Sequence, residues 1–186
     1  DNKRVTEGTL SSNTSGYSAA RSRMPLKAAE WFAKQVSQSL IDATQPTLKK
    51  RRVFTLDGTT MTLPAEPALR KAFPPASNQY GKGVWPVMLL TVCHELSSGA
   101  ALVPEVGAMY GPEAVSETAL IRQSLAQLPP DSVVMADAGF GIFSVAYQIK
   151  LARHVFLLRM TQQRFDSLKK KAELMEEAEK RAAAVQ

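Results

Sequence analysis

Thiol and imidazole groups are scarce in this chain. Its 186 residues include one cysteine and two histidines. A single cysteine cannot form a disulfide within the chain, which suits a reducing cytosol, and Cys93 lies in an apolar run where a buried structural thiol is expected. The same counts argue against a zinc site built from Cys and His. Any bound metal should therefore have oxygen ligands, which favours Mg²⁺ or Mn²⁺.

Long apolar segments are also missing. No apolar stretch reaches the roughly 20 residues needed to cross a bilayer, and the first residues are polar and charged, unlike a signal peptide. The length suits about one domain, and a 45% apolar content is enough for a hydrophobic core. The net charge of +6 predicts an anionic partner, most simply nucleic acid; the alternative is a basic surface that serves only solubility.

The two ends of the chain differ from its middle. Residues 1–23 are rich in Ser, Thr, Asn and Gly and predict a flexible entry. A helix is predicted over 25–43, with a face that should pack on the core and is formed by Leu26, Ala29, Phe32, Val36 and Leu40. Residues 161–186 are highly charged and predict a solvent-exposed helix. We therefore expect three parts: a flexible segment plus helix (1–48), a central core (49–160) and a charged helix (161–186).

The middle of the chain alternates between strand and helix patterns. The expected elements are strands at 52–57, 87–95, 101–106, 133–136 and 154–160, a helical turn near 66–72, and helices at 112–128 and 141–153. The order of strand, hairpin, helix, strand, helix, strand predicts an α/β protein with a mixed sheet flanked by helices.

Two aspartates are the leading candidates for a functional site. Asp57 and Asp137 each end a short apolar run and are followed by small residues. In α/β sheets, ligands gather at the carboxyl ends of strands, where both residues are expected. Two neighbouring carboxylates repel each other, and divalent cations relieve that repulsion. The pair therefore predicts a metal site suited to phosphoryl transfer.

Basic residues upstream and downstream of Asp57 are candidates for contacts with a DNA backbone. The run at 49–52 is basic throughout, and the loop at 79–83 carries a tyrosine and a lysine. The alternative for the run is a solvated approach to a strand. The candidate phosphate-binding residues are Lys49, Lys50, Arg51, Arg70, Lys71 and Lys82.

Five blocks, in order, resemble bacterial insertion-sequence transposases of the DDE class, in the group typified by insertion sequence four. They are Ala20-Arg21-Ser22-Arg23-Met24-Pro25-Leu26, Leu56-Asp57-Gly58-Thr59-Thr60, Ser116-Glu117-Thr118-Ala119-Leu120, Val134-Met135-Ala136-Asp137-Ala138-Gly139-Phe140 and Phe156-Leu157-Leu158-Arg159-Met160. The resemblance covers about residues 17–168. It implies an RNase H-like fold in which Asp57 and Asp137, with a glutamate, bind two divalent ions. It also implies cleavage and joining of double-stranded DNA at transposon ends, a homodimer and a bacterial cytoplasm.

The third acid of that family is not found by its motif. The motif runs Tyr, two residues, Arg, three residues, Glu, six residues, Lys, and the last tyrosine, Tyr147, is not followed by the arginine. We therefore expect a chain truncated before the catalytic glutamate and inactive in strand cleavage. The alternative is a substitute acid in the tail, for which the candidates are Glu173, Glu176, Glu177 and Glu179.

Two other functions remain open at this point. One is a DNA-binding remnant of a mobile element without catalysis. The other is a haloacid-dehalogenase-like phosphatase, whose Asp-x-Asp-Gly-Thr block needs a nucleophilic aspartate where this chain has Thr55. Glu117 is expected on a helix surface, Glu105 at a surface or sheet edge, and His94 as a structural histidine within its strand.

Overall fold

A five-stranded sheet organises the chain in the computed structural model, which describes residues 6–8 and 13–183. Its strands are β1 (Val53–Thr62), β4 (Val87–Glu95), β5 (Glu105–Ala108), β6 (Val133–Ala136) and β7 (Val155–Leu158). They lie side by side in the order β5-β4-β1-β6-β7. β4 is antiparallel to β1 and to β5, whereas β6 and β7 run parallel to β1. Counted along the chain, the order is third, second, first, fourth, fifth with only the second strand reversed. This is the RNase H-like arrangement, and the predicted mixed α/β sheet is confirmed.

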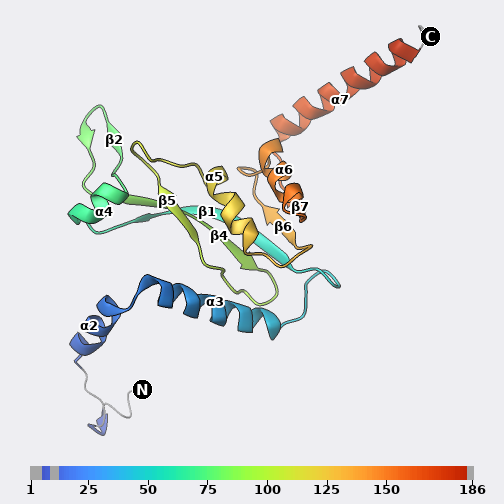
Figure 1. Cartoon of the computed structure of the whole chain (residues 1–186). Coiled ribbons are helices and arrows are strands. Elements are labelled where there is room, and N and C mark those ends of the chain that lie inside the picture. Colours follow the sequence, from blue (N-terminus) through green and yellow to red (C-terminus); the bar gives the residue numbers. More distant parts are fainter. Residues whose placement is uncertain (1–5, 9–12, 184–186) are drawn as a thin grey trace.

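Helices α5 (Glu117–Ala126) and α6 (Phe143–Leu151) make the connections into β6 and β7 (Figure 1). They pack on one face of the sheet and form the core with it. The buried side chains of this core include Phe54, Leu56, Cys93 and Val134 from the strands, Ile121 and Leu125 from α5, and Val145 and Ile149 from α6. Full burial of an apolar side chain of this size contributes about 1.5–3 kcal/mol. The expected burial of Cys93 is confirmed.

The opposite face of the sheet is more open. Along β1 the side chains alternate, so that Phe54 and Leu56 are buried whereas Asp57 and Thr59 are exposed. His94, on the neighbouring strand, is exposed as well. The polar end of β1 and its neighbours therefore remain accessible to a ligand.

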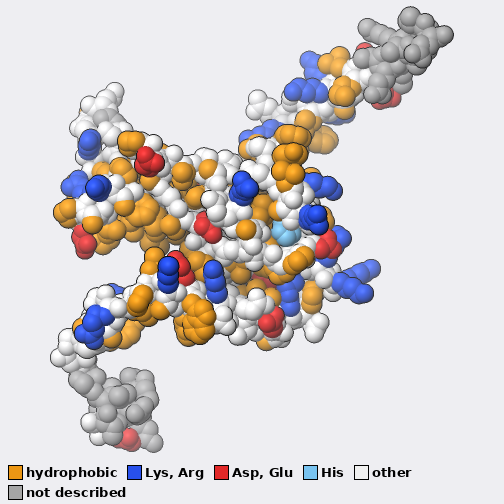
Figure 2. Space-filling model, in the orientation of Figure 1, with side chains coloured by type: hydrophobic (Ala, Val, Ile, Leu, Met, Phe, Trp, Pro, Cys, Tyr) orange, Lys and Arg blue, Asp and Glu red, His pale blue; other side chains and the backbone are white. Residues whose placement is uncertain are grey.

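The amino-terminal part differs from its prediction in two ways. Helix α2 (Ser15–Arg23) occupies part of the segment expected to be flexible, while residues 1–5 and 9–12 of that segment lie outside the described residues. Helix α3 (Leu26–Asp42) begins and ends close to the predicted bounds. However, the face of α3 that contacts the core is not the predicted one. Most of the predicted face is exposed, namely Leu26, Phe32, Val36 and Leu40, and hydrophobic side chains are visible on the helix surface (Figure 2).

Two other residues attach α3. The Ser37 hydroxyl donates to the carbonyl oxygen of Ala101 at 2.6 Å, and Ile41 is buried in the core cluster. In an α-helix each of these residues lies about 100° around the axis from its predecessor, Val36 or Leu40. Because this hydrogen bond and this buried side chain set the rotation of the helix, the larger apolar stripe turns away from the core.

The remaining boundaries show local effects that periodicity does not capture. The predicted hairpin partner at 101–106 becomes β5 at Glu105–Ala108, because Pro104 has no N–H to donate to a ladder. Helix α5 starts at Glu117 rather than residue 112, because the Ser116 hydroxyl caps it by accepting from the Ala119 N–H at 3.3 Å. The predicted turn near 66–72 is α4 (Pro67–Ala72).

The chain also contains two short strands and one long helix. A two-stranded hairpin joins β2 (Ser77–Asn78) to β3 (Gly81–Lys82) in a stretch predicted to be a loop. Helix α7 (Gln162–Ala183) extends away from the sheet (Figure 1), as predicted for a solvent-exposed charged helix. Among the described residues, no helix combines the length and apolar character that crossing a membrane requires.

Candidate active site

Asp57 and Asp137 lie side by side at the end of the β1–β6 pairing. The parallel register pairs Leu56 with Ala136, and the two aspartates are the next residues of their strands. Neighbouring strands lie about 4.8 Å apart, so the two carboxylates share one location. Both line a cavity of about 520 Å³, which we call the acid notch. The predicted proximity of the two acids is therefore present in the structure, while their catalytic role stays a prediction.

The notch exists because one strand stops while its neighbour continues. β1 was expected to end at Asp57, but it runs on to Thr62, and Asp57 pairs with Val92 of β4. The prediction of a strand-terminal Asp57 is therefore wrong. β-branched Thr59, Thr60 and Thr62 favour the continued strand. β6 does stop at Ala136, because Asp137 bonds to its own following backbone instead of continuing the ladder.

Backbone amides orient both carboxylates. Oδ1 of Asp57 accepts from the Gly58 N–H at 2.8 Å. Oδ1 of Asp137 accepts from the Gly139 N–H at 2.8 Å and from the Phe140 N–H at 3.4 Å. Across the described part of the chain, the second oxygen of each carboxylate has no hydrogen bond. Each aspartate is thus held by one oxygen and presents the other to a ligand.

Glu117 places a third carboxyl group on the core face of the sheet, opposite the side chain of Asp57, and does not line the notch. It is the first residue of α5, and its side chain packs against the backbone of Gly58, next to Asp57. A Cβ atom at Gly58 would lie 2.5 Å from Cδ and from Oε1 of Glu117. Glu117 is half-buried here rather than on a solvated helix surface. Gly58 lies in the interior of β1, where a glycine often marks a close approach by another group, but the predicted strand at 52–57 ended before it.

Arg164 supports the loop that carries Asp137. Its Nη1 donates to the carbonyl oxygen of Ala138 at 2.6 Å and to that of Gly141 at 3.4 Å. Gly141 itself packs against the Arg159 carbonyl so closely that a Cβ has no room there. Arg164 lies at the start of the charged carboxyl-terminal helix, and nothing in its sequence context distinguishes it from the other basic residues of that helix.

The structure also corrects or refines the expectations for other polar residues. His94 is exposed and lines the acid notch, so it is not the satisfied structural histidine that was expected. Thr55, the position of the nucleophile in the phosphatase alternative, lines the same notch with a hydroxyl in place of a carboxylate. Glu105 lies on the edge strand β5, as expected, and its Oε1 accepts from Gln127 Nε2 at 2.8 Å.

Glu95 is a buried acid that the sequence did not single out. It accepts from the Ser98 N–H and the Ser98 hydroxyl, each at 2.7 Å, and lies 3.4 Å from Arg52 Nη1. Burial alone raises its pKa, but the Ser98 hydrogen bonds and the Arg52 charge together outweigh burial and hold the pKa below its ordinary value. It pairs across from Phe54, near the amino end of β1 and on the face that packs on the helices, so we assign it a structural role.

The basic run lies away from the acid notch. Lys49, Lys50 and Arg51 precede the amino end of β1, and Arg51 Nε donates to Asp131 Oδ2 at 2.9 Å in an exposed ion pair. Arg51 comes six residues before Asp57, which corresponds to roughly 20 Å along an extended strand. A phosphate held at the notch is therefore out of direct reach of this run.

Two of the other basic candidates come together beyond the carboxyl end of β1. Arg70 of α4 and Lys82 of β3 line one cavity of about 560 Å³. Arg70 Nη2 donates to the Gly83 carbonyl oxygen at 3.3 Å, and Lys71 is exposed beside it on α4. The structure thus groups Arg70 and Lys82 and separates them from Lys49, Lys50 and Arg51. Contact with DNA stays a prediction for all six.

Among the described residues, no group of three or more His, Cys, Asp or Glu side chains lies close enough together to hold a metal ion. Two aspartates with oxygen donors still fit Mg²⁺, which is often held by one or two carboxylates together with substrate phosphates and water. The donor set therefore suits a cation that arrives with a phosphorylated substrate.

Comparison with known proteins gives little independent information. No family model matches the sequence, and no curated protein matches it. Among solved structures, the chain is similar to one described as "Crystal structure of the Mos1 Strand Transfer Complex", with 13% sequence identity and a TM-score of 0.32. The match covers 69% of this chain and 39% of that chain, so the chain spans well under half of that protein's length. A likeness of this size carries no argument about function.

Proposed function

We propose that this chain carries part of the catalytic core of a DDE transposase of the insertion-sequence-four type, which breaks and joins DNA strands by phosphoryl transfer. One observation carries the proposal: Asp57 and Asp137 occupy consecutive positions after the same register pair of β1 and β6. The sheet around them has the strand order of the RNase H-like fold. The five sequence blocks that resemble the family include the segments around both aspartates.

The chemistry follows from the orientation of the two carboxylates. Divalent ions bound there would supply the Lewis acidity that activates a water or 3′-hydroxyl and stabilises the leaving oxygen. Asp57 and Asp137 would hold them through the oxygens that the backbone amides leave unused. His94, which is exposed and lines the notch, would contact a phosphate oxygen of DNA bound there.

We assign Glu117 a supporting role at this site. Its carboxyl group packs on Gly58, across the sheet from the Asp57 side chain, and adds a negative charge that would favour cations at the notch without contacting them. The family's Tyr/Arg/Glu/Lys motif is not in this chain, so we expect cation and DNA binding by the chain itself and assign strand cleavage to the complete transposase.

Calorimetric titration with Mn²⁺ tests the proposal. Asp57→Ala and Asp137→Ala should each weaken binding by at least about tenfold, since each removes one of two carboxylate ligands. Glu113→Gln provides a matched control, because Glu113 is exposed and does not line the notch. Binding that is the same in both aspartate variants and in the wild type would remove the basis of the assignment.

A further inference from the structure

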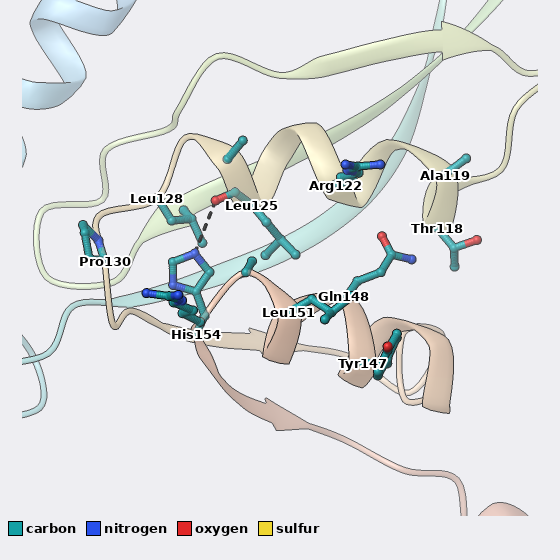
Figure 3. A pocket seen from close by; sticks show the side chains of 13 residues that line it. Thr118, Ala119, Arg122, Leu125, Leu128, Pro130, Tyr147, Gln148, Leu151 and His154 are labelled. Atoms are coloured by element: carbon teal, nitrogen blue, oxygen red, sulfur yellow. Dashed lines mark hydrogen bonds between the residues drawn. The ribbon is translucent and has the colours of Figure 1, made fainter.

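A second cavity lies between helices α5 and α6, on the side of the helices away from the acid notch. Its volume is about 1010 Å³, and we call it the α5–α6 groove. Figure 3 shows its two walls: Thr118 and Arg122 on α5, and Tyr147 and Gln148 on α6, with Gln148 extending toward α5. The groove shares no lining residue with the acid notch. It therefore belongs to neither the proposed metal site nor its supporting loop.

The lining of the groove carries positive charge only. Arg122 and Arg153 are both exposed there, and neither Asp nor Glu lines the groove. A guanidinium group presents paired N–H donors that match a phosphate or carboxylate. The groove therefore suits a ligand with at least one anionic group.

The end of helix α6 fixes the backbone position of Arg153. It follows α6 with a φ of 60°, the left-handed region in which glycine is the usual residue. The His154 N–H donates to the Ile149 carbonyl oxygen, and the Arg153 N–H donates to that of Lys150, each at 3.0 Å, which closes the end of the helix. This is the left-handed ending of many helices, and it fixes the point at which the Arg153 side chain leaves α6.

The wall of α6 carries an exposed aromatic pair. Phe143 and Tyr147 are one helical turn apart, and their rings stack with centroids 5.9 Å apart and an angle of 14° between the planes. Phe143 is 84% exposed and Tyr147 is 54% exposed. Tyr147 lines the groove itself. Flat aromatic faces beside arginines are the elements with which proteins bind unpaired nucleotides, through base stacking and phosphate contacts.

The far end of the groove is closed by His154. Its ring is buried, and Nε2 lies 3.4 Å from the Leu125 carbonyl oxygen, a contact drawn in Figure 3. Since a carbonyl can only accept, this contact places the proton on Nε2. Nδ1 has no hydrogen-bond partner within the described residues. Nδ1 is then a buried acceptor that offers nothing to an anion, so any anionic group must bind at Arg122 and Arg153.

We infer that the α5–α6 groove binds an unpaired stretch of nucleic acid, with a base stacked on the Phe143–Tyr147 pair and phosphates on Arg122 and Arg153. The stacked aromatic pair favours this ligand over an acidic peptide, because every nucleobase has a flat face to offer. The overall charge of +6 acts in the same direction. The inference goes beyond the proposed phosphoryl transfer and does not depend on the aspartates or on a metal.

Fluorescence anisotropy with a labelled oligothymidylate of about 12 nucleotides, in the presence of a metal chelator, tests the inference. Tyr147→Leu should weaken binding roughly tenfold through loss of stacking. The double variant Arg122→Gln/Arg153→Gln should also bind more weakly. The slope of its log affinity against log salt concentration should be smaller in magnitude by about 1.4, which is the contribution of two phosphate contacts to a single strand. Lys169→Gln, on α7 and outside the groove, should bind as the wild type does.

Further variants separate this inference from the proposed function. Asp57→Ala and Asp137→Ala should leave oligothymidylate binding unchanged, so a failure of the metal site does not affect the result. All of the groove substitutions lie at exposed positions, and circular dichroism will verify that the variants fold. If Tyr147→Leu and the double arginine variant both bind as tightly as the wild type, the inference is overturned and protein docking becomes the better use of the groove.

Photo-crosslinking supplies a readout that a change in stability cannot imitate. An oligonucleotide carrying 5-iodouracil, irradiated with the wild-type protein, should form its main adduct on Tyr147 or Phe143, located by mass spectrometry of the digested protein. Adducts confined to residues other than Phe143, Tyr147 and those that line the groove would contradict the inference, even if affinity falls in the variants.

Discussion

Replacing Gly58 with alanine should weaken cation binding while leaving the protein folded. The new Cβ would lie 2.5 Å from Cδ and Oε1 of Glu117, closer than non-bonded atoms can come, so the carboxyl group must move. The obstructing atoms are the far end of a flexible side chain rather than backbone. Glu117 can therefore turn away and take its negative charge away from Asp57.

The expected change in stability is small because two terms oppose each other. Alanine in a strand interior is more favourable than glycine by about 0.5–1 kcal/mol, because glycine loses more conformational freedom on folding. Moving the Glu117 side chain away from its rotamer costs about 0.5–1.5 kcal/mol. The free energy of unfolding should thus change by less than about 1 kcal/mol, which corresponds to a shift in Tm of about 2–4 °C for a chain of this size.

The expected change in metal affinity comes from charge alone, because Glu117 has no hydrogen bond to either aspartate among the described residues. One unit charge roughly 8 Å from a divalent ion contributes about 1 kcal/mol in water. We therefore expect the Mn²⁺ affinity of Gly58→Ala to fall by about fivefold, while circular dichroism reports nearly unchanged thermal unfolding. Glu117→Gln should show a similar loss, and the double variant should lose no more than either single variant, because both changes remove the same charge.

The control and the refuting outcome are both clear. Gly16→Ala, in α2, places a Cβ where nothing lies within 4 Å and should leave Mn²⁺ binding unchanged. If Gly58→Ala binds Mn²⁺ as tightly as the wild type, in a protein for which Asp57→Ala abolishes binding, then Glu117 does not support the notch. A drop in Tm well beyond 4 °C would refute the estimate that the two stability terms nearly cancel.

Two further predictions concern buried ionisable groups. The pKa of Glu95 is lower in the folded chain than its ordinary value of 4.5, so its contribution to stability is present above that value and lost as the pH falls through the folded pKa. The free energy of unfolding of the wild type, measured in urea, should therefore fall more steeply below about pH 4.5 than that of Glu95→Gln. Equal slopes would contradict the role of the Ser98 and Arg52 contacts. Burial raises the pKa of the Cys93 thiol from 9.0 to about 12. A thiol-reactive disulfide reagent at pH 8 should thus modify Cys93 only as fast as the protein unfolds; rapid reaction of the folded protein would show that the thiol is accessible.

The sheet could be predicted because its signals are local. Apolar runs such as 133–136, separated by helical patterns and turns, identify strands from one short window at a time. Their sequence also places Asp57 and Asp137 at equivalent positions after their apolar residues, from which the proximity of the two acids follows once the strands are parallel neighbours. The length of β1 could not be predicted from the sequence, because its continuation past Asp57 depends on pairing with β4.

Features that depend on contacts between distant segments were missed. The carboxyl group of Glu117 comes against Gly58 only because the folded chain brings the first residue of α5 to β1. Arg164 and the Ala138 carbonyl meet through the same kind of packing. The rotation of α3 was predicted from its apolar stripe, but a hydrogen bond from Ser37 and the burial of Ile41 decide it. A single helix pattern does not reveal which of two neighbouring faces has a partner.

The parallel pairing of β1 with β6 has a consequence for the order of folding. Its register joins Val53 to Val133, which are 80 residues apart, whereas the antiparallel pairing of β1 with β4 begins with Thr62 and Val87, only 25 residues apart. Closing the longer loop costs about 1 kcal/mol more in chain entropy, so the antiparallel strands should pair first. The two aspartates then become neighbours only when β6 docks, late in folding. During synthesis, Asp57 of a nascent chain would therefore lie in the paired β1 and β4 strands well before Asp137 arrives to complete a site that could bind a metal ion.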